Sequence, residues 1–291
     1  MSSSRDYLGS YRLIRLIRGG QICNVWEAIL DGKKDRVAIK VLLARHKENK
    51  TEIAQLRNEG KVGVELEHEN VIKVFEFVDR YDLPFLVMQL FNAKNLKQMI
   101  RDEYQTLAVS IPEIVKQSAA SLEYLHSRSW IHCDVKPDNF LVNNDGVVKL
   151  IDFSIAQALK KQKRSLFGKK TVQGTRSYMA PEQIRGKPLD ETTDVYGYGC
   201  VMHELLAGKP PFTGTNPDEL LQKHLRATPP PLIAFNKAVS EDFAKLILKT
   251  LSKDQKKRPA NFTVFLQELA KIRVYKAGHR PKLPESEVED E

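Results

Sequence analysis

The sequence predicts an α+β fold with two lobes, and three observations support this prediction. Strand-like apolar runs dominate residues 11–90, with one helical pattern among them. Helical periodicity dominates from residue 91 onward. A chain of 291 residues is long for one compact domain and suits one two-lobed unit. We therefore expect a β-rich lobe at 11–90 and a mainly helical lobe at 91–275, flanked by an N-terminal extension at 1–10 and an acidic, flexible tail at 276–291.

The first lobe is expected to hold strands rich in β-branched and aromatic residues. These strands are predicted at 11–17, 25–30, 36–42, 71–78 and 85–90. Asp31-Gly32 is a turn signal between the second and third of them. The helical pattern covers Thr51–Leu66, where Ile53, Leu56, Gly60 and Gly63 recur at roughly helical spacing.

The second lobe begins with helical signals and contains one hairpin. Ser110-Ile111-Pro112-Glu113 has capping-box spacing, which predicts that a helix starts there. Asn144-Asp145-Gly146 between two short apolar runs predicts a β-hairpin. The segment 195–207 is apolar almost all round, so we expect a buried helix that ends at Gly208. Amphipathic helices are expected at 240–251 and 263–274.

Composition narrows the class of protein. With 42% hydrophobic and 29% charged residues, the chain can build a core. It has no run of about 18 apolar residues and no secretory signal pattern at its start, so no membrane span and a cytoplasmic location are expected. Cys23, Cys133 and Cys200 lack metal-ligand spacing, which favours free thiols. The net charge is +9, but the basic residues are not interleaved with aromatic residues, so no nucleic-acid partner is expected. No feature of the sequence specifies an oligomeric state.

Four short motifs follow one another along the chain. They are Val37-Ala38-Ile39-Lys40, His132-Cys133-Asp134-Val135-Lys136-Pro137-Asp138-Asn139, Asp152-Phe153-Ser154 and Ala180-Pro181-Glu182. Together, in this order, they are typical of phosphoryl-transfer chemistry, which requires that phosphates are held, their charge neutralised and an acceptor hydroxyl oriented.

Individual residues can be assigned to those requirements. Lys40 ends a strand, where its ammonium group can hold phosphates, and Glu59 lies near the apolar face of the predicted helix as its carboxylate partner. Asp134 is the candidate base for the acceptor hydroxyl. Asn139 and Asp152 offer the hard oxygen ligands that Mg²⁺ prefers. The alternative, a solvated Lys–Glu pair and ordinary turn-forming Asp and Asn residues, is disfavoured by the shared order of the motifs.

From about residue 8 to 275 the chain resembles a eukaryotic-type Ser/Thr protein kinase domain, most closely the bacterial members. The resemblance implies the bilobal kinase fold with ATP bound between the lobes, Mg²⁺ or Mn²⁺ as the metal, and protein substrates with Ser or Thr hydroxyls, the chain itself included. The alternative is a pseudokinase, or a weakly active nucleotide-binding scaffold. The set Lys40, Glu59, Asp134, Asn139 and Asp152 argues against it, because a pseudokinase usually lacks at least one member.

Further residues acquire expected roles from the resemblance. Lys136 would contact the γ-phosphate, and Thr175 would contact Asp134 and Lys136. Glu182 and Arg258 resemble the pair that anchors the activation segment, and Asp194 resembles the residue that braces the catalytic loop. The residues expected to bind the nucleotide are Ile17, Arg18, Gly20, Val25, Ala38, Lys40, Met88, Gln89, Phe91 and Leu141. Candidate phosphorylation sites are Ser165, Thr171, Thr175 and Ser177, and the segment around Ser165 is strongly basic.

The chain departs from the family pattern at several control positions. Arg18 and Cys23 replace two glycines of the phosphate loop, so ATP binding is expected to be weaker or altered unless the loop tolerates them. Cys133 replaces the Arg before the catalytic Asp, the residue that in the family pairs with a phosphorylated loop residue. We therefore predict that loop phosphorylation is not the main on-switch through this contact, and that Cys133 is a buried, inert thiol rather than a redox sensor. Ser154 replaces the Gly after Phe153, which either restricts the turn or is tolerated.

Gly60 and Gly63 leave two interpretations of the predicted helix open. Each glycine costs a helix about 0.5–1 kcal/mol relative to Ala. The helix is therefore either soft, needing a partner to seat Glu59, or packed closely through its backbone. In the family, an apolar side chain usually stands at the position of Gly63 and stacks on the residue equivalent to Phe153.

Overall fold

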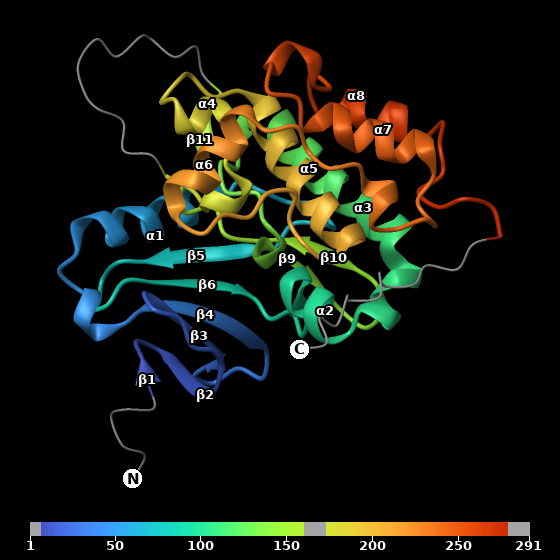
Figure 1. Ribbon diagram of the computed structural model, residues 1–291. Helices are drawn as coiled ribbons and strands as arrows, with labels where there is room; N and C mark the ends of the chain where they lie inside the picture. The colour runs from blue at the N-terminus through green and yellow to red at the C-terminus, as the bar shows by residue number, and fades with distance from the viewer. Residues whose placement is uncertain (1–6, 160–172, 279–291) are drawn as a thin grey trace, which may run out of the picture. The chain divides into compact units, whose positions relative to one another are not determined.

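The computed structural model describes residues 7–159 and 173–278, which form two compact units. The first unit contains the chain up to Ala93 together with Ile151–Ala156, and the second contains Lys94–Leu150 and the chain from Gln157 onward. The first unit is rich in strands and the second mainly helical (Figure 1), so the predicted α+β class is confirmed. The short segment Ile151–Ala156 was expected in the second lobe, but it packs with the first unit.

The first unit is built on an antiparallel sheet with the strand order β1-β2-β3-β4-β6-β5. The strands are β1 Tyr7–Leu8, β2 Tyr11–Arg18, β3 Cys23–Leu30, β4 Arg36–Leu42, β5 Val74–Val78 and β6 Phe85–Gln89. Strand β1 lies inside the predicted N-terminal extension, because Gly9 turns with a φ of 59° and pairs Leu8 with Tyr11. The fourth predicted strand is shorter than expected and begins at Val74 instead of Val71.

Alternation along the strands gives this sheet two apolar faces. Ile39, Val41 and Val87 share one face with Tyr11 and Phe85. The other face holds a second cluster, which also contains Leu56 of α1: Ala38, Leu42, Leu56, Val74, Leu86 and Met88. Because side chains alternate with period two, Lys40 shares this second face with Ala38 and Leu42, on the side of the sheet that α1 covers.

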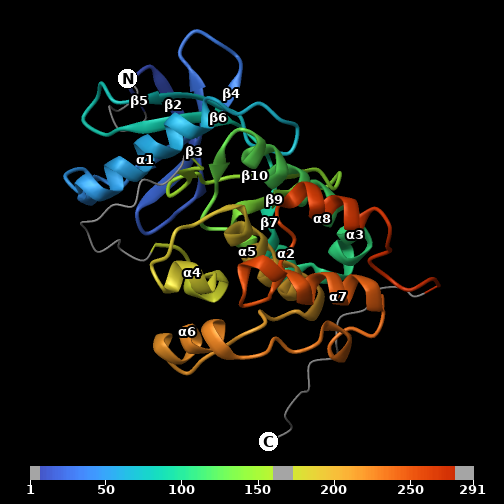
Figure 2. The same cartoon turned by 90° about the horizontal axis from the view of Figure 1, so that it is seen from above.

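Helix α1, Lys50–Gly63, replaces the predicted helix at Thr51–Leu66 and runs alongside β5 and β6 (Figure 2). Asn49 caps its start by accepting hydrogen bonds from the backbone N–H groups of Thr51 and Glu52. Both glycines of α1 face the sheet at close range. An added Cβ would lie 2.6 Å from Cβ of Phe77 at Gly60, and 2.3 Å from Cγ2 of Val74 at Gly63. The close-packing interpretation therefore accounts for both glycines. Gly63 faces Val74 of β5, at the position where the family usually has an apolar side chain.

The second unit is organised around the buried helix α5, Glu191–Ala207, which was predicted at 195–207 and is capped by Gly208 with a φ of 73°. Its other helices are α2 Leu96–Asp102, α3 Tyr104–Ser127, α4 Pro181–Ile184, α6 Pro217–Arg226, α7 Glu241–Thr250 and α8 Phe262–Leu269. Its strands are β7 Lys94–Asn95, β8 Trp130–Ile131, β9 Phe140–Val142, β10 Val148–Leu150 and β11 Gln157–Ala158. The predicted hairpin is confirmed as β9 and β10, whereas α8 ends five residues earlier than expected.

The predicted helix start at Ser110 is wrong, because α3 begins at Tyr104 and carries Pro112 in its interior. Proline has no N–H to donate, so the carbonyl of Ala108, four residues earlier, loses its helical partner. The hydroxyl of Tyr275 donates to that carbonyl at 3.3 Å and so satisfies it from outside the helix. No helix within the described residues is long and apolar enough to cross a membrane.

Gly63→Ala tests how α1 is held. Intrinsic helix propensity alone would stabilise the variant by about 0.5–1 kcal/mol. The new methyl group would instead overlap Val74, and overpacking of this kind costs about 1–3 kcal/mol. We expect urea unfolding to show net destabilisation, partly relieved in Gly63→Ala/Val74→Ala relative to Val74→Ala alone. A more stable Gly63→Ala protein would instead support the soft-helix interpretation.

Candidate active site

In the first unit the structure brings Lys40, Glu59 and Asp152 together. Lys40 extends from β4, and its Nζ lies 2.6 Å from Oε2 of Glu59 on α1. The same Nζ lies 3.5 Å from Oδ1 of Asp152. The Glu59 side chain is 4% exposed, whereas Asp152 retains 29% of its exposure. Lys40 is thus oriented by one buried carboxylate and one accessible carboxylate.

Burial and charge act in opposite directions on this cluster. Burial raises the pKa of Glu59 to about 7; Lys40 opposes this rise and Asp152 adds to it. For Lys40, burial lowers the pKa, but the carboxylates of Asp152 and Glu59 outweigh it and hold the pKa above its ordinary value. Lys40 is therefore a permanent cation near neutral pH, and Glu59 is the member of the pair that titrates.

The turn Asp152-Phe153-Ser154 is fastened to α1 by Asn58. Its Nδ2 donates to the backbone carbonyls of Phe153 and Ser154, each at 3.1 Å, and of Ala156 at 3.0 Å. Asp152 has a φ of 67°, whereas Ser154 does not lie in the left-handed region. A side chain at position 154 is therefore compatible with this backbone, and glycine is not required there.

In the predicted phosphate loop, Gly20 stands at a position where the backbone leaves no room for a side chain. An added Cβ at Gly20 would lie 2.5 Å from the carbonyl oxygen of Cys23, so the tight turn excludes a side chain there. Arg18 is exposed at the end of β2 and pairs with Val25. Cys23 is half-buried at the start of β3, and burial raises the pKa of its thiol to about 11, which keeps it protonated at neutral pH.

The predicted adenine-binding residues fall in both units. Val25 lies opposite Lys40 in the β3–β4 ladder, and Ala38 lies opposite Met88 in the β4–β6 ladder. Ile17 is an exposed residue of β2. Gln89 ends β6, and Phe91 follows it, half-buried. Leu141 belongs to β9 of the second unit, where it pairs with Asn95 and Lys149.

In the second unit three residues form a closed polar triangle. Nζ of Lys136 lies 2.5 Å from Oδ2 of Asp134 and 3.0 Å from Oγ1 of Thr175. The backbone N–H of Thr175 donates to Oδ1 of Asp134 at 2.8 Å, and its hydroxyl contacts the same oxygen at 2.9 Å. Asp134 and Lys136 come from the loop after β8, and Thr175 precedes the turn at Arg176–Tyr178. The triangle thus fixes the carboxylate of Asp134 against an ammonium group and a hydroxyl.

Asn139 and Asp152 have the chemistry of ligands for a hard divalent cation. Nδ2 of Asn139 donates to the backbone carbonyl of Asp134 at 2.9 Å, which orients the side chain and leaves its oxygen on the opposite side. Asp152 presents a partly exposed carboxylate beside Lys40. Oxygen donors of this kind suit Mg²⁺ or Mn²⁺, so the residues fit the metal that the sequence predicts. No compact group of three or more His, Cys, Asp or Glu side chains among the described residues offers an alternative metal site.

The backbone before Asp134 is strained and held from both sides. Cys133 has a φ of 66°, which is unusual for a residue with a side chain. Its N–H donates to Oδ1 of Asp194 at 2.9 Å, and its carbonyl accepts from Nε2 of Gln183 at 2.8 Å. Oε1 of Gln183 in turn accepts from the N–H of Ala180 at 3.0 Å. The Cys133 thiol itself is buried, as predicted.

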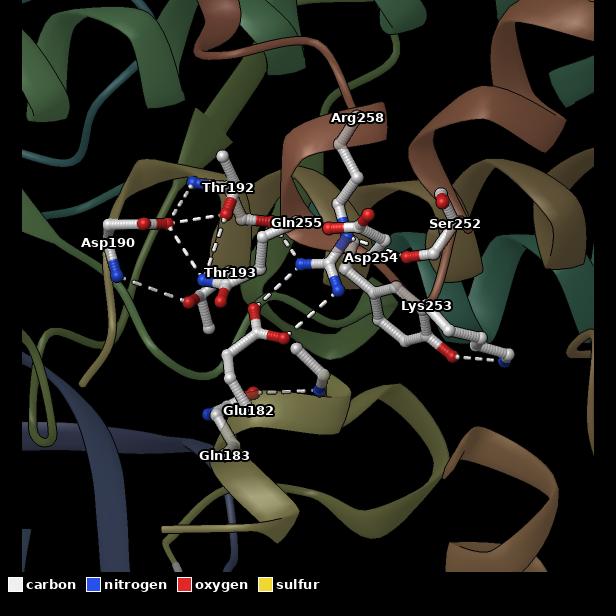
Figure 3. Close-up of polar contacts among 12 residues, drawn as sticks. Glu182, Gln183, Asp190, Thr192, Thr193, Ser252, Lys253, Asp254, Gln255 and Arg258 are labelled. Atoms are coloured by element: carbon white, nitrogen blue, oxygen red, sulfur yellow. Dashed lines mark hydrogen bonds and ion pairs between the residues drawn. The ribbon is translucent and has the colours of Figure 1, made fainter. Parts of the chain in front are cut away.

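The end of the activation segment is anchored by a buried ion pair (Figure 3). Nη1 and Nη2 of Arg258 lie 2.7 and 3.0 Å from the two carboxylate oxygens of Glu182, and both side chains are almost fully buried. Arg258 also donates to the carbonyls of Thr192 and Ser252. This fork-to-fork geometry satisfies both charges and joins α4 to the segment after α7.

The candidate phosphorylation sites divide into two groups. Ser165 and Thr171, with the basic segment around them, lie outside the described residues. Thr175 is engaged in the triangle with Asp134 and Lys136, and Ser177 is half-buried in the following turn.

Sequence reasoning missed Asn58 and Gln183, whose amides bind backbone carbonyls. Neither belongs to a motif, and their partners are far away in the sequence. The one available signal was position, because Asn58 directly precedes Glu59 and Gln183 directly follows Glu182.

Comparison with known proteins places this chain among protein kinases. The family described as the protein kinase domain matches residues 11–270. Serine/threonine-protein kinase PknB of Mycobacterium tuberculosis is 30% identical over 251 residues, which is 85% of this chain and 40% of that protein. Serine/threonine-protein kinase PrkC of Bacillus subtilis is 31% identical over 249 residues, 84% of this chain and 38% of that protein. The chain thus spans about two-fifths of the length of these curated relatives.

The titration of Glu59 predicts the acid limb of the pH profile. As the pH falls through about 7, Glu59 takes up a proton and loses its charge interaction with Lys40. We expect kcat/KM for ATP, which reports ionisations of the free enzyme, to fall by up to about tenfold per pH unit below that point. Glu59→Gln, which mimics the protonated acid, should have low activity without this limb. An unchanged acid limb in Glu59→Gln would assign the titration to another group.

Proposed function

The chain belongs to the protein kinase family, and from this premise we propose that it transfers the γ-phosphate of ATP to Ser or Thr hydroxyls of proteins, itself included. Three of the relatives that support the specificity are named as Ser/Thr kinases, in Mycobacterium, Bacillus and Lactococcus. The observation that carries the proposal is the Asp134–Lys136–Thr175 triangle, because it combines a base with a cation two residues further on.

The acceptor hydroxyl is activated at Asp134. Its carboxylate can accept the proton of a Ser or Thr hydroxyl as the oxygen attacks the γ-phosphorus, while the bond from that phosphorus to the β–γ bridging oxygen breaks and ADP leaves. Thr175 and Lys136 fix the orientation of that carboxylate before the substrate arrives, so little reorganisation is needed during the reaction. Lys136 also places a positive charge where negative charge develops on the transferred group.

The phosphates of ATP are held by Lys40. Glu59 and Asp152 orient its ammonium group, so the cation is presented in one position. Asn139 and Asp152 would hold Mg²⁺ or Mn²⁺, which when bound neutralises phosphate charge. Val25, Ala38 and Met88 supply an apolar surface of the kind that an adenine ring requires.

A protein acceptor suits the anchored segment better than a small molecule does. Thr175 is tied to Asp134, and Glu182 is buried against Arg258 seven residues later. Residues 174–182 are thus fixed at both ends beside the proposed base. Residues 178–182 are buried, whereas residues 174–177 keep exposure and supply the ordered surface on which part of an extended peptide can lie.

Removing the base or the phosphate-binding lysine should abolish activity without unfolding the protein. With Mg-ATP and a mixture of Ser, Thr and Tyr peptides, we expect phosphate only on Ser and Thr. Asp134→Asn should lose about 10²–10⁴ in kcat. Lys40→Met should lose at least about 10².

Matched controls are available on the exposed loops of the first unit. Asp82→Asn and Lys34→Met make the same chemical changes at exposed positions and should retain full activity. Mass spectrometry would locate and count the transferred phosphates. Equal phosphate incorporation by wild type, Asp134→Asn and Lys40→Met would contradict the proposal, and nucleotide binding without transfer in wild type would favour a pseudokinase.

A further inference from the structure

One amide group on α1 faces three backbone carbonyls of the turn that carries Asp152. Nδ2 of Asn58 lies 3.0–3.1 Å from the carbonyl oxygens of Phe153, Ser154 and Ala156. All four residues belong to the first unit. Asn58 is half-buried, and the neighbouring Phe153 is fully buried. This side chain therefore makes an interior contact between two segments that are 95 residues apart at their closest pairing.

The chemistry of this contact requires a hydrogen-bond donor. Three carbonyl oxygens converge on one nitrogen, and each carries partial negative charge. The two N–H groups of an amide can serve them through shared hydrogen bonds. A carboxylate of the same size would instead place an oxygen against three oxygens, with no proton between them.

The turn held in this way contains a strained residue. Asp152 has a φ of 67°, which lies in the left-handed region that residues with a side chain rarely adopt. Such a residue persists only when surrounding contacts over-determine it. Within the turn, the N–H of Ser154 donates to Oδ1 of Asp152 at 3.3 Å, and the N–H of Ala156 donates to the carbonyl of Phe153 at 3.1 Å. Asn58 adds contacts from outside the turn.

Asn58 is adjacent to Glu59, so the same helix serves two functions. Glu59 orients Lys40, while Asn58 holds the turn that presents Asp152. We propose that Asn58 is a positioning residue for the metal ligand Asp152. The position of α1 then controls the phosphate-binding lysine through Glu59 and the metal-binding turn through Asn58. The catalytic consequence rests on the proposed kinase function; the clamp itself does not.

Two substitutions distinguish a donor from a space-filling role. Asn58→Ala removes the hydrogen bonds, and Asn58→Asp keeps the size but adds repulsion. A donor role predicts that damage increases from wild type to Ala to Asp, whereas a space-filling role predicts that Asp is less damaged than Ala. Gln55→Ala, one turn earlier on α1, is the matched control.

The first readout is hydrogen–deuterium exchange of the nucleotide-free protein. We expect exchange at the amides of Ser154 and Ala156 to accelerate at least several-fold in Asn58→Ala and further in Asn58→Asp, with no change in Gln55→Ala. Thermal unfolding of each variant identifies any that fails to fold, and Asn58→Ala then carries the test alone. Unchanged exchange at 154 and 156 in folded variants, or a smaller effect in Asp than in Ala, would overturn the proposal.

The second readout is the Mg²⁺ concentration at half-maximal kinase activity. It should rise several-fold in the same order, while KM for the peptide stays unchanged, because Asp152 is the proposed ligand of the metal and has no proposed contact with the peptide. A rise in peptide KM with an unchanged Mg²⁺ requirement would contradict a role through Asp152. If wild type transfers no phosphate, the proposed function fails, whereas the exchange order still decides whether Asn58 holds the turn.

Discussion

The first unit depends on the close approach of α1 to β5 and β6. Gly60 and Gly63 present bare backbone to the sheet, where any Cβ would overlap Phe77 or Val74. This contact sets the distance between α1 and the sheet, and it therefore also sets the positions of the α1 side chains that face the site. Glu59 reaches Lys40, and Asn58 reaches the carbonyls after Asp152, because the helix backbone lies where it does. Two glycines that would weaken an isolated helix thus allow α1 to pack closely on the sheet in the folded protein.

In the second unit, buried polar contacts hold the loop that carries Asp134. Cys133 adopts a left-handed backbone conformation, and Asp194 and Gln183 hold its N–H and its carbonyl. Thr175 then binds the carboxylate of Asp134, and Glu182 is locked by Arg258. Contacts built into the fold therefore hold the catalytic loop and the end of the activation segment together. Cys133 stands where the family pattern has an Arg, and in this chain the contacts of Asp194 and Gln183 hold the backbone at that position.

Local sequence patterns predicted most helices and strands, whereas the features that they missed depend on contacts between residues far apart in the sequence. The hairpin at 144–146 and the buried helix ending at Gly208 follow from turn chemistry and apolar periodicity, which act within a few residues. The helix start at Ser110 was mispredicted because Pro112 lies inside α3, where Tyr275, far along the chain, supplies the hydrogen bond that the proline removes. The motifs predicted roles for Lys40, Asp134 and Asp152, and the structure places Lys40 beside Asp152 and Asp134 beside Lys136. The roles of Asn58 and Gln183 were not predicted because their partners are backbone carbonyls, and every residue type has a backbone carbonyl.

The central claim is that catalytic competence is built into the fold and does not depend on a phosphate on the activation segment. The most direct measurement is the progress curve of phosphatase-treated wild type, with intact mass confirming that no phosphate remains and with peptide phosphorylation followed from the first turnovers. The account predicts that product accumulates linearly from the first turnovers. The rate per enzyme molecule should not depend on enzyme concentration and should not change on later autophosphorylation. A lag that disappears as one phosphate accumulates on the segment would contradict it.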